Sequence, residues 1–241
     1  MRSSTMKRWI GAAGLCAGVL SAGAAFAAGP VSVVEIFTSQ GCSSCPPAHD
    51  NFNALHDGPD LLALSFGVTY WNQLGWKDTF AQPAFTSRQM AYAKSLHHGP
   101  FTPQVVVDGR ADTVGAQKGE IEQVVARTTL LGGPSIDIKG GAVKLGGARF
   151  QGPAADVWLV RYDPRVVQVP IKAGENDGRT LPQKNVVKEL VRLGAWSGGA
   201  ETFQAPHGQL GLSTAVLVQR PAPARSSPPP AANPLPIQEL P

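Results

Sequence analysis

Residues 31–55 read VSVVEIFTSQGCSSCPPAHDNFNAL, and this stretch decides the fold expected for the first part of the chain. It begins with Val31–Phe37, which is mostly apolar and β-branched, as is typical of a buried strand. Apolar residues then recur at helical spacing from the second cysteine onward, which predicts one buried stripe of a helix. The residues of that stripe are Cys45, Ala48, Phe52 and Leu55. A Cys-Ser-Ser-Cys pair therefore lies at the junction between a strand and an amphipathic helix.

Cys42 and Cys45 are the only cysteines that remain once residues 1–27 are removed as an export signal. Closing so short a loop stabilises a fold by roughly 2 kcal/mol through chain entropy, less than a long-range disulfide would. The pair is better suited to forming and breaking a disulfide than to holding distant parts of a fold together. The spacing therefore indicates a redox site.

The first residues are typical of a secretory signal. Arg2, Lys7 and Arg8 give a basic start, and Trp9–Leu20 is an apolar stretch too short to span a bilayer. Small residues then precede the expected cleavage point after Ala27, so we predict that residues 1–27 are a signal peptide. The alternative is an uncleaved membrane anchor.

The charge of the mature chain does not indicate a nucleic-acid partner. The chain has 21 Lys and Arg against 17 Asp and Glu, and residues 1–27 hold three of the basic residues and none of the acidic ones. The remaining 18 basic and 17 acidic residues give a net charge of +1. No later apolar run is long enough for a membrane span, so we expect a periplasmic or secreted protein, where disulfides persist.

Residues 28–132 alternate strand and helix signals, which predicts a layered α/β domain with a partly parallel sheet. After the first strand and helix, further strands are expected at Leu61–Val68 and Val105–Val107. Further helices are expected at Ala84–Leu96 and Gly119–Leu131.

Residues 133–220 show a different pattern, which predicts a smaller, β-rich, sandwich-like domain. A hairpin is expected over residues 136–145, and further strands at Val157–Val160, Val166–Ile171 and Ala215–Val218. The stretch Gln183–Leu193 suits either a helix or a strand, and its β-branched content favours a strand. Residues 221–241 are rich in proline, which predicts a disordered tail.

The order of strand, CxxC at a helix start, strand, helix and Thr102-Pro103 before a further strand resembles the thioredoxin superfamily. The segments EIFTSQGCSSCPPA, YWNQLGWKD, FTSRQMAYA and FTPQVVVDGR are similar to those of an uncharacterised family of exported bacterial thioredoxin-like proteins, a domain of unknown function. The resemblance covers most of the mature chain. It implies an α/β thioredoxin-like N-terminal domain followed by the smaller β-rich domain.

The resemblance also implies roles for single residues. Cys42 matches the exposed nucleophilic cysteine of the superfamily, and Cys45 matches the resolving one. Pro103 matches a proline whose preceding peptide bond is cis and faces the cysteine pair, which would leave the Thr102 backbone free to pair with an extended substrate. The alternative is a trans proline that opens a strand. Because Pro46 is well suited to the first turn of the helix, the helix dipole is expected to act less directly on Cys42.

Three further side chains are candidates for the site. Glu35 lies in the first strand, near where thioredoxins keep a buried acid, and could relay a proton from Cys45. The alternative for Glu35 is an edge position or a buried partner for a basic group. Trp71 and Trp76 follow the second strand and could form a substrate-facing wall, or else belong to a small satellite core.

The favoured hypothesis is an exported thiol–disulfide oxidoreductase. Its partners would be protein or small-molecule thiols and disulfides, together with an unidentified redox partner that recycles the pair, and it would need no cofactor. One alternative is a non-enzymatic binding module in which the cysteines form a permanent disulfide.

A second alternative is an envelope protein that handles Cu or Zn. Its ligands would be the two cysteines and His49, completed by one of the histidines at positions 56, 97 and 98. The chain has no second CxxC and no methionine cluster, so four ligands would have to converge from distant positions.

Overall fold

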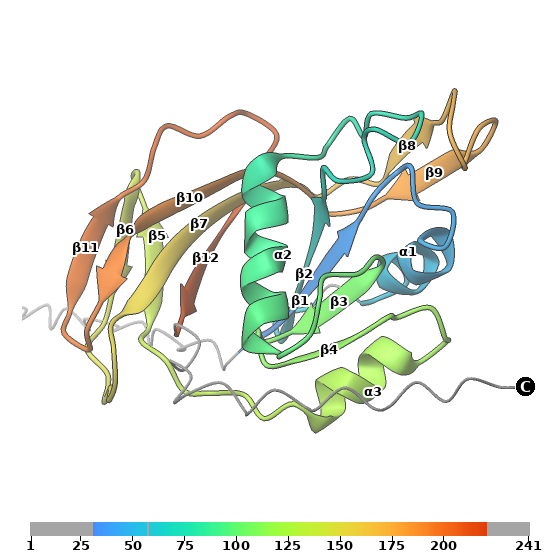
Figure 1. The fold of residues 1–241 in the computed structure, drawn as a ribbon. Helices are drawn as coiled ribbons and strands as arrows, with labels where there is room; N and C mark the ends of the chain where they lie inside the picture. Colours follow the sequence, from blue (N-terminus) through green and yellow to red (C-terminus); the bar gives the residue numbers. More distant parts are fainter. Residues whose placement is uncertain (1–30, 57, 221–241) are drawn as a thin grey trace, which may run out of the picture.

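Strand β1 (Ser32–Thr38) lies inside a mixed sheet of the computed structural model, which describes residues 31–56 and 58–220 (Figure 1). It pairs in parallel with β2 (Leu61–Gly67) and antiparallel with β3 (Gln104–Val107). β3 pairs antiparallel with the short strand β4 (Ala111–Thr113). The first part of the chain therefore forms a four-stranded unit in the order β2-β1-β3-β4.

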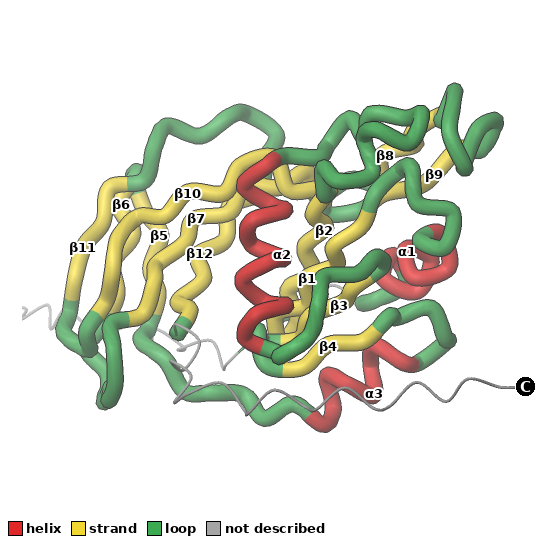
Figure 2. Tube along the Cα trace, viewed as in Figure 1, coloured by secondary structure: helices red, strands yellow, loops and turns green. Residues whose placement is uncertain are grey.

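Three helices cover the two faces of these strands (Figure 2). Helices α1 (Pro46–Asn53) and α3 (Glu120–Arg127) bury their apolar residues in one cluster with Val34 and Ile36 of β1. Helix α2 (Pro83–Ser95) packs on the other face, in a cluster that includes Phe37. Successive residues of β1 thus serve different faces, as the alternation of side chains along a strand requires.

The same sheet continues into the second half of the chain. Strands β10 (Val186–Trp196), β7 (Ala155–Asp163) and β12 (Ser213–Gln219) follow β2 in that order, so the sheet has seven strands. The junction is short: β10 pairs in parallel with β2 at Val186 and Ser65. Strands from both predicted domains therefore share one sheet and the core beneath α2.

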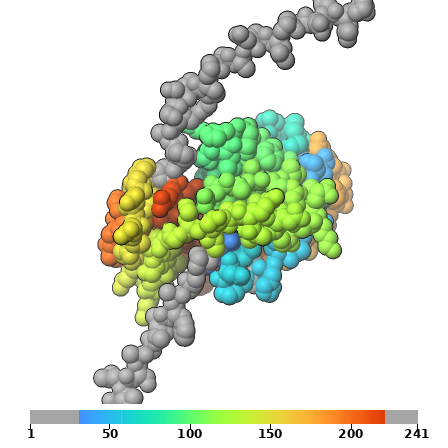
Figure 3. All heavy atoms as spheres, turned by 90° about the horizontal axis from the view of Figure 1, so that it is seen from below, coloured from blue at the N-terminus to red at the C-terminus, as the bar shows by residue number. Residues whose placement is uncertain are grey.

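Two smaller sheets complete the fold. The first has the order β11-β6-β5, with β5 (Ile136–Lys139), β6 (Ala142–Leu145) and β11 (Glu201–Gln204), and it packs on β7 and β10. The second pairs β8 (Val167–Pro170) with β9 (Thr180–Gln183) close to α1. Figure 3 shows the segment that leads from α3 to β5 running along one side of the molecule.

Most predicted elements are confirmed, and Gln183–Leu193 lies largely in a strand, as favoured. Helix α3 is shorter than predicted, because it ends at Arg127 and Thr128 is already extended. Strands β4, β9 and β11 are not among the predicted elements, since each has only three or four residues and little apolar alternation.

The predicted signal peptide and proline-rich tail lie outside the described residues. Within residues 31–56 and 58–220, no helix is both long and apolar enough to cross a membrane.

Candidate redox-active site

Cys42 and Cys45 form a disulfide with their Cα atoms 5.4 Å apart. Both cysteines are buried, with exposed fractions of 0% and 1%, whereas Ser43 and Ser44 between them are exposed. The burial predicted for Cys45 is confirmed. The exposure expected for Cys42 is wrong, because the loop turns its side chain inward and leaves the two serines at the surface.

Helix α1 begins one residue after the pair. Pro46 opens the helix, and Cys45 is its N-cap without any side-chain capping bond. Within the loop, the Cys45 amide donates to the Cys42 carbonyl at 3.2 Å. The prediction that the helix starts at Pro46 is confirmed, so the N-terminal end of the helix lies nearer to Cys45 than to Cys42.

The Thr102-Pro103 peptide bond is cis, as predicted, and it lies beside the disulfide. The Thr102 carbonyl oxygen is 4.0 Å from Cys42 Sγ, and the Thr102 hydroxyl donates to that sulfur at 3.6 Å. On the other side of the sulfur, Ser44 Oγ lies 3.4 Å away. These hydroxyls can stabilise a thiolate at Cys42 when the pair is reduced.

The two tryptophans predicted as a wall have separate positions. Trp71 donates its ring N–H to Thr102 Oγ1 at 2.8 Å, so it orients the hydroxyl that contacts Cys42. Trp76 donates to Gln40 Oε1 at 3.0 Å and packs on the small apolar cluster of β8 and β9. Trp71 therefore borders the site, whereas Trp76 has the satellite-core position given as its alternative.

A buried polar network, which the sequence analysis did not identify, holds the turn that precedes the pair. The Gln40 amide donates to Asp78 Oδ2 at 2.7 Å, and Gln40 also bonds to Thr79 and Trp76. Burial raises the pKa of Asp78, although the amides of Gln40, Phe80 and Ala81 that donate to its carboxylate act in the opposite direction. The network fixes the backbone immediately before Gly41 and Cys42.

A loop from the second half of the chain, residues 174–179, lies over the cysteine loop. Asn176 is fully buried, and its side-chain amide donates to the carbonyl oxygens of Gln40 and Cys42 at 3.0 and 2.9 Å. The neighbouring Glu175 accepts a hydrogen bond from the Ser43 amide at 3.2 Å. The sequence analysis gave Asn176 no role, because no local pattern links positions 134 residues apart.

Glu35 has the other role considered for it, as a buried partner for a basic group. Arg88 of α2 donates to both of its carboxylate oxygens, at 2.5 and 2.9 Å, and the Tyr92 hydroxyl donates at 2.5 Å. These partners lie on the α2 face of the sheet, opposite the face that α1 and Cys45 occupy. We therefore withdraw the proton relay from Glu35 to Cys45, because the sheet separates the two side chains.

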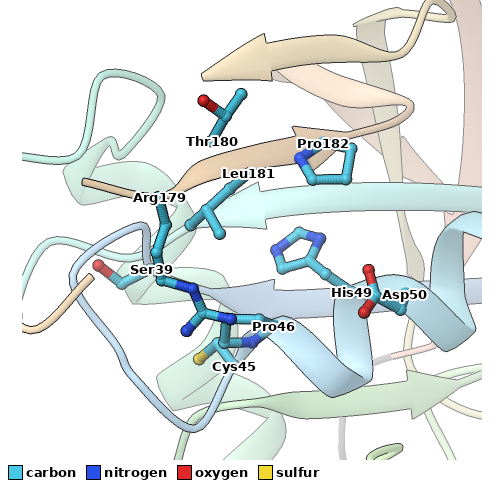
Figure 4. Close-up of a pocket in the computed structure, with 9 residues that line it drawn as sticks. All are labelled: Ser39, Cys45, Pro46, His49, Asp50, Arg179, Thr180, Leu181 and Pro182. Carbon is cyan, nitrogen blue, oxygen red and sulfur yellow. The ribbon is translucent and has the colours of Figure 1, made fainter. Parts of the chain in front are cut away.

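Cys45 instead borders a cavity of about 160 Å³ between α1 and β9 (Figure 4). The cavity is also lined by Ser39, His49 and Arg179, and Figure 4 shows the Arg179 guanidinium group reaching toward Cys45 and Pro46. His49 is 4% exposed, and its Nε2 lies 3.0 Å from Thr38 Oγ1. Burial lowers the pKa of His49 to about 4, so its ring is neutral at neutral pH.

The ligand set of the metal-handling hypothesis is not brought together. Across the described residues, no group of three or more His, Cys, Asp or Glu side chains could hold a metal ion. His98 pairs with Asp112 at 2.8 Å, and His56 is exposed.

Comparisons with known proteins give a family and a fold. A family model described as a protein of unknown function (DUF1223) matches residues 33–219, which include the cysteine pair, Thr102-Pro103 and the loop 174–179. A search of curated proteins finds no match. A crystal structure of a protein from Agrobacterium tumefaciens is similar, with 30% identity, a TM-score of 0.58, and coverage of 73% of this chain and 79% of that one.

HBP35 of Porphyromonas gingivalis has a similar fold at 13% identity. Its TM-score is 0.57, and the match covers 81% of this chain and 71% of HBP35. At this identity the similarity concerns the fold alone.

Proposed function

The chain belongs to the DUF1223 family of unknown function, and we propose that it is an exported thiol–disulfide oxidoreductase with Cys42 as nucleophile and Cys45 as resolving cysteine. The observation that carries the proposal is the disulfide at a helix start, with the Thr102 carbonyl and hydroxyl oxygens 4.0 and 3.6 Å from the Cys42 sulfur. A stabilised thiolate is what a nucleophilic cysteine requires.

A thioredoxin-like arrangement of the first part of the chain belongs to the same proposal. It is supported by the strand order β2-β1-β3-β4, with β1 parallel to β2 and antiparallel to β3. It is also supported by α1 and α3 on one face, α2 on the other, and a cis-proline beside the cysteine pair.

The same site can work in two directions. When it oxidises, a substrate thiolate attacks the Cys42 sulfur, the Cys42–Cys45 bond breaks, and its electron pair leaves on Cys45. A second substrate thiolate then attacks the substrate sulfur of the mixed disulfide, which releases the substrate disulfide and reduced Cys42. When it reduces, the Cys42 thiolate attacks a substrate disulfide and Cys45 displaces the reduced substrate. A separate thiol or disulfide partner then returns the pair to its starting state.

One observation favours a second function, a binding module with a permanent disulfide. Both cysteines are fully buried, and Asn176 holds the loop 174–179 on the cysteine loop. A substrate must displace part of this covering to reach Cys42, whereas a structural disulfide needs no such access.

An equilibrium redox titration of the mature protein distinguishes the two functions, with the state of Cys42 and Cys45 scored by thiol alkylation. We expect a potential above about −230 mV, in the range of exchanging catalysts. A potential below about −300 mV would mark a bond that resists cellular thiol pools, and would transfer the assignment to the binding module.

A further inference from the structure

The two sulfur atoms of the pair have different tasks in the proposed reaction, and the second task requires a proton acceptor. Resolution needs the Cys45 thiolate, because the thiol itself is a poor nucleophile. An acceptor must lie within hydrogen-bond reach of the sulfur, directly or through one water. Glu35 cannot serve, since it is paired with Arg88 on the opposite face of the sheet.

His49 is the group that the structure offers on the Cys45 side. It lies one helical turn after Cys45, with its amide bonded to the Cys45 carbonyl at 3.1 Å, and both residues line the same cavity (Figure 4). The Nδ1 atom of His49 is buried and has no hydrogen-bond partner within the part of the chain that the structure describes. A buried ring nitrogen without a partner is rare enough in folded proteins to call for an explanation.

We propose that His49 accepts the proton of the Cys45 thiol in the resolving step, an inference that rests on the proposed oxidoreductase function. In the tautomer whose Nε2–H donates to Thr38 Oγ1, the free Nδ1 takes the proton directly or through a water, for which a cavity of about 160 Å³ has room.

The step balances without any further reactant. The Cys45 sulfur forms its bond to the Cys42 sulfur, the bond between Cys42 and the substrate sulfur breaks, and the electron pair leaves on the substrate thiolate. The proton passes from His49 to solvent. The new thiolate and the imidazolium stabilise each other, which offsets the unfavourable charge on a buried ring.

The other charged groups around the cavity do not fit this role. Asp50 is exposed, and Figure 4 shows its carboxylate on the side of His49 away from Cys45. Arg179 has no lone pair to accept a proton, and it donates to Asn176 Oδ1 at 2.9 Å. Its positive charge near Cys45 would add to the stabilisation of the thiolate.

A two-phase reaction with 5,5′-dithiobis(2-nitrobenzoate) tests the inference on the reduced mature protein. The first equivalent of aromatic thiolate reports attack by Cys42, and the second reports displacement by Cys45. We expect His49→Gln to slow the second phase about tenfold or more at neutral pH, since a positioned base contributes about 10²–10⁴-fold. The first phase should change by less than about twofold, and the difference in the second phase should shrink as pH rises and hydroxide replaces the base.

The outcomes separate the two proposals. His56→Gln, at an exposed histidine, is the matched control and should leave both phases unchanged. An unchanged second phase in His49→Gln, or an equal slowing of both phases, overturns the role of His49 alone. Absence of the first phase in the unmodified protein overturns the oxidoreductase function instead.

A second measurement applies if His49→Gln does not fold. In Cys42→Ser, which keeps Cys45 as a free thiol, NMR with ¹⁵N-labelled histidine follows Nδ1 of His49 across the ionisation of Cys45. We expect the Nδ1 signal to shift with that ionisation, and to lose this response in Cys42→Ser/Cys45→Ala. A His49 signal that does not change while Cys45 ionises contradicts the inference.

Discussion

The two sulfur atoms of the disulfide are equally buried, yet the side chains around them differ. Cys42 is surrounded by hydroxyl groups, since Thr102 Oγ1 and Ser44 Oγ lie 3.6 and 3.4 Å from its sulfur. Cys45 borders the cavity that also contains His49 and Arg179. Hydroxyls that stabilise an anion suit an attacking thiolate, whereas a base suits a thiol that must lose its proton later in the reaction.

His49 should also make the stability of the oxidised protein depend on pH. Burial lowers its pKa from 6.5 to about 4 in the folded state, so below pH 6.5 the unfolded chain binds a proton that the folded chain does not. Stability from this group is therefore complete above pH 6.5 and is lost as pH falls toward 4. Relative to His49→Gln, the free energy of unfolding should fall by about 3 kcal/mol across that window.

Urea unfolding of both oxidised proteins at several pH values measures this difference. Because other carboxylates titrate in the same range, only the difference between the two proteins reports on His49. Parallel stability curves would show that the histidine is protonated in the folded protein as readily as in the unfolded one.

The loop 174–179 connects two elements that are far apart in the sequence. Gly174 has a φ of 78°, a conformation that glycine adopts without strain, and its Cα approaches within 3.3 Å of the place where a Cβ on Gly75 would lie. This close approach brings Asn176 over the cysteine loop, where its side-chain amide satisfies the Gln40 and Cys42 carbonyls. Access to the disulfide is therefore controlled by an element outside the predicted thioredoxin-like region.

Asn176→Ala should destabilise the fold and open the site. It leaves two buried carbonyl oxygens without this donor, which costs about 1–3 kcal/mol for each unsatisfied group. We expect a lower urea midpoint and faster reduction of the Cys42–Cys45 disulfide by dithiothreitol in native conditions. The exposed Asp177 on the same loop provides the control, and Asp177→Ala should change neither quantity.

In the molecule as a whole, one buried ion pair joins both halves of the sheet. Arg88 of α2 binds Glu35 of β1, donates to Gln219 of β12 at 3.1 Å, and lies 5.8 Å from the Trp158 ring of β7. Burial alone would lower the pKa of Arg88, but the Glu35 carboxylate and Tyr92 more than offset this and raise it. The pair therefore holds its charge in the core where the two halves meet.

Glu35→Gln should cost about 3–5 kcal/mol of unfolding free energy, because it leaves the Arg88 charge buried without its counterion. The rates of both phases of the disulfide reaction should remain those of the unmodified protein in the folded fraction. Asp156→Asn breaks a half-exposed pair with Arg192 and should cost less than about 1 kcal/mol. A slower second phase at unchanged stability would restore the proton relay from Glu35.

The sequence was sufficient for much of the local structure. The start of α1 at Pro46 and the strand character of β10 followed from backbone geometry and residue type, and both are confirmed. The strands β4, β9 and β11 were missed, since short polar segments become strands only when a partner strand lies beside them.

By itself, the sequence determined that two cysteines lie at a strand–helix junction, because spacing and periodicity are properties of neighbouring residues. Only the tertiary structure decided which groups surround each sulfur. Glu35 faces α2 and not Cys45 because the helices take opposite faces of the sheet, and Asn176 reaches Cys42 across 134 residues. Such contacts arise from how the packed elements meet, and no local pattern records them.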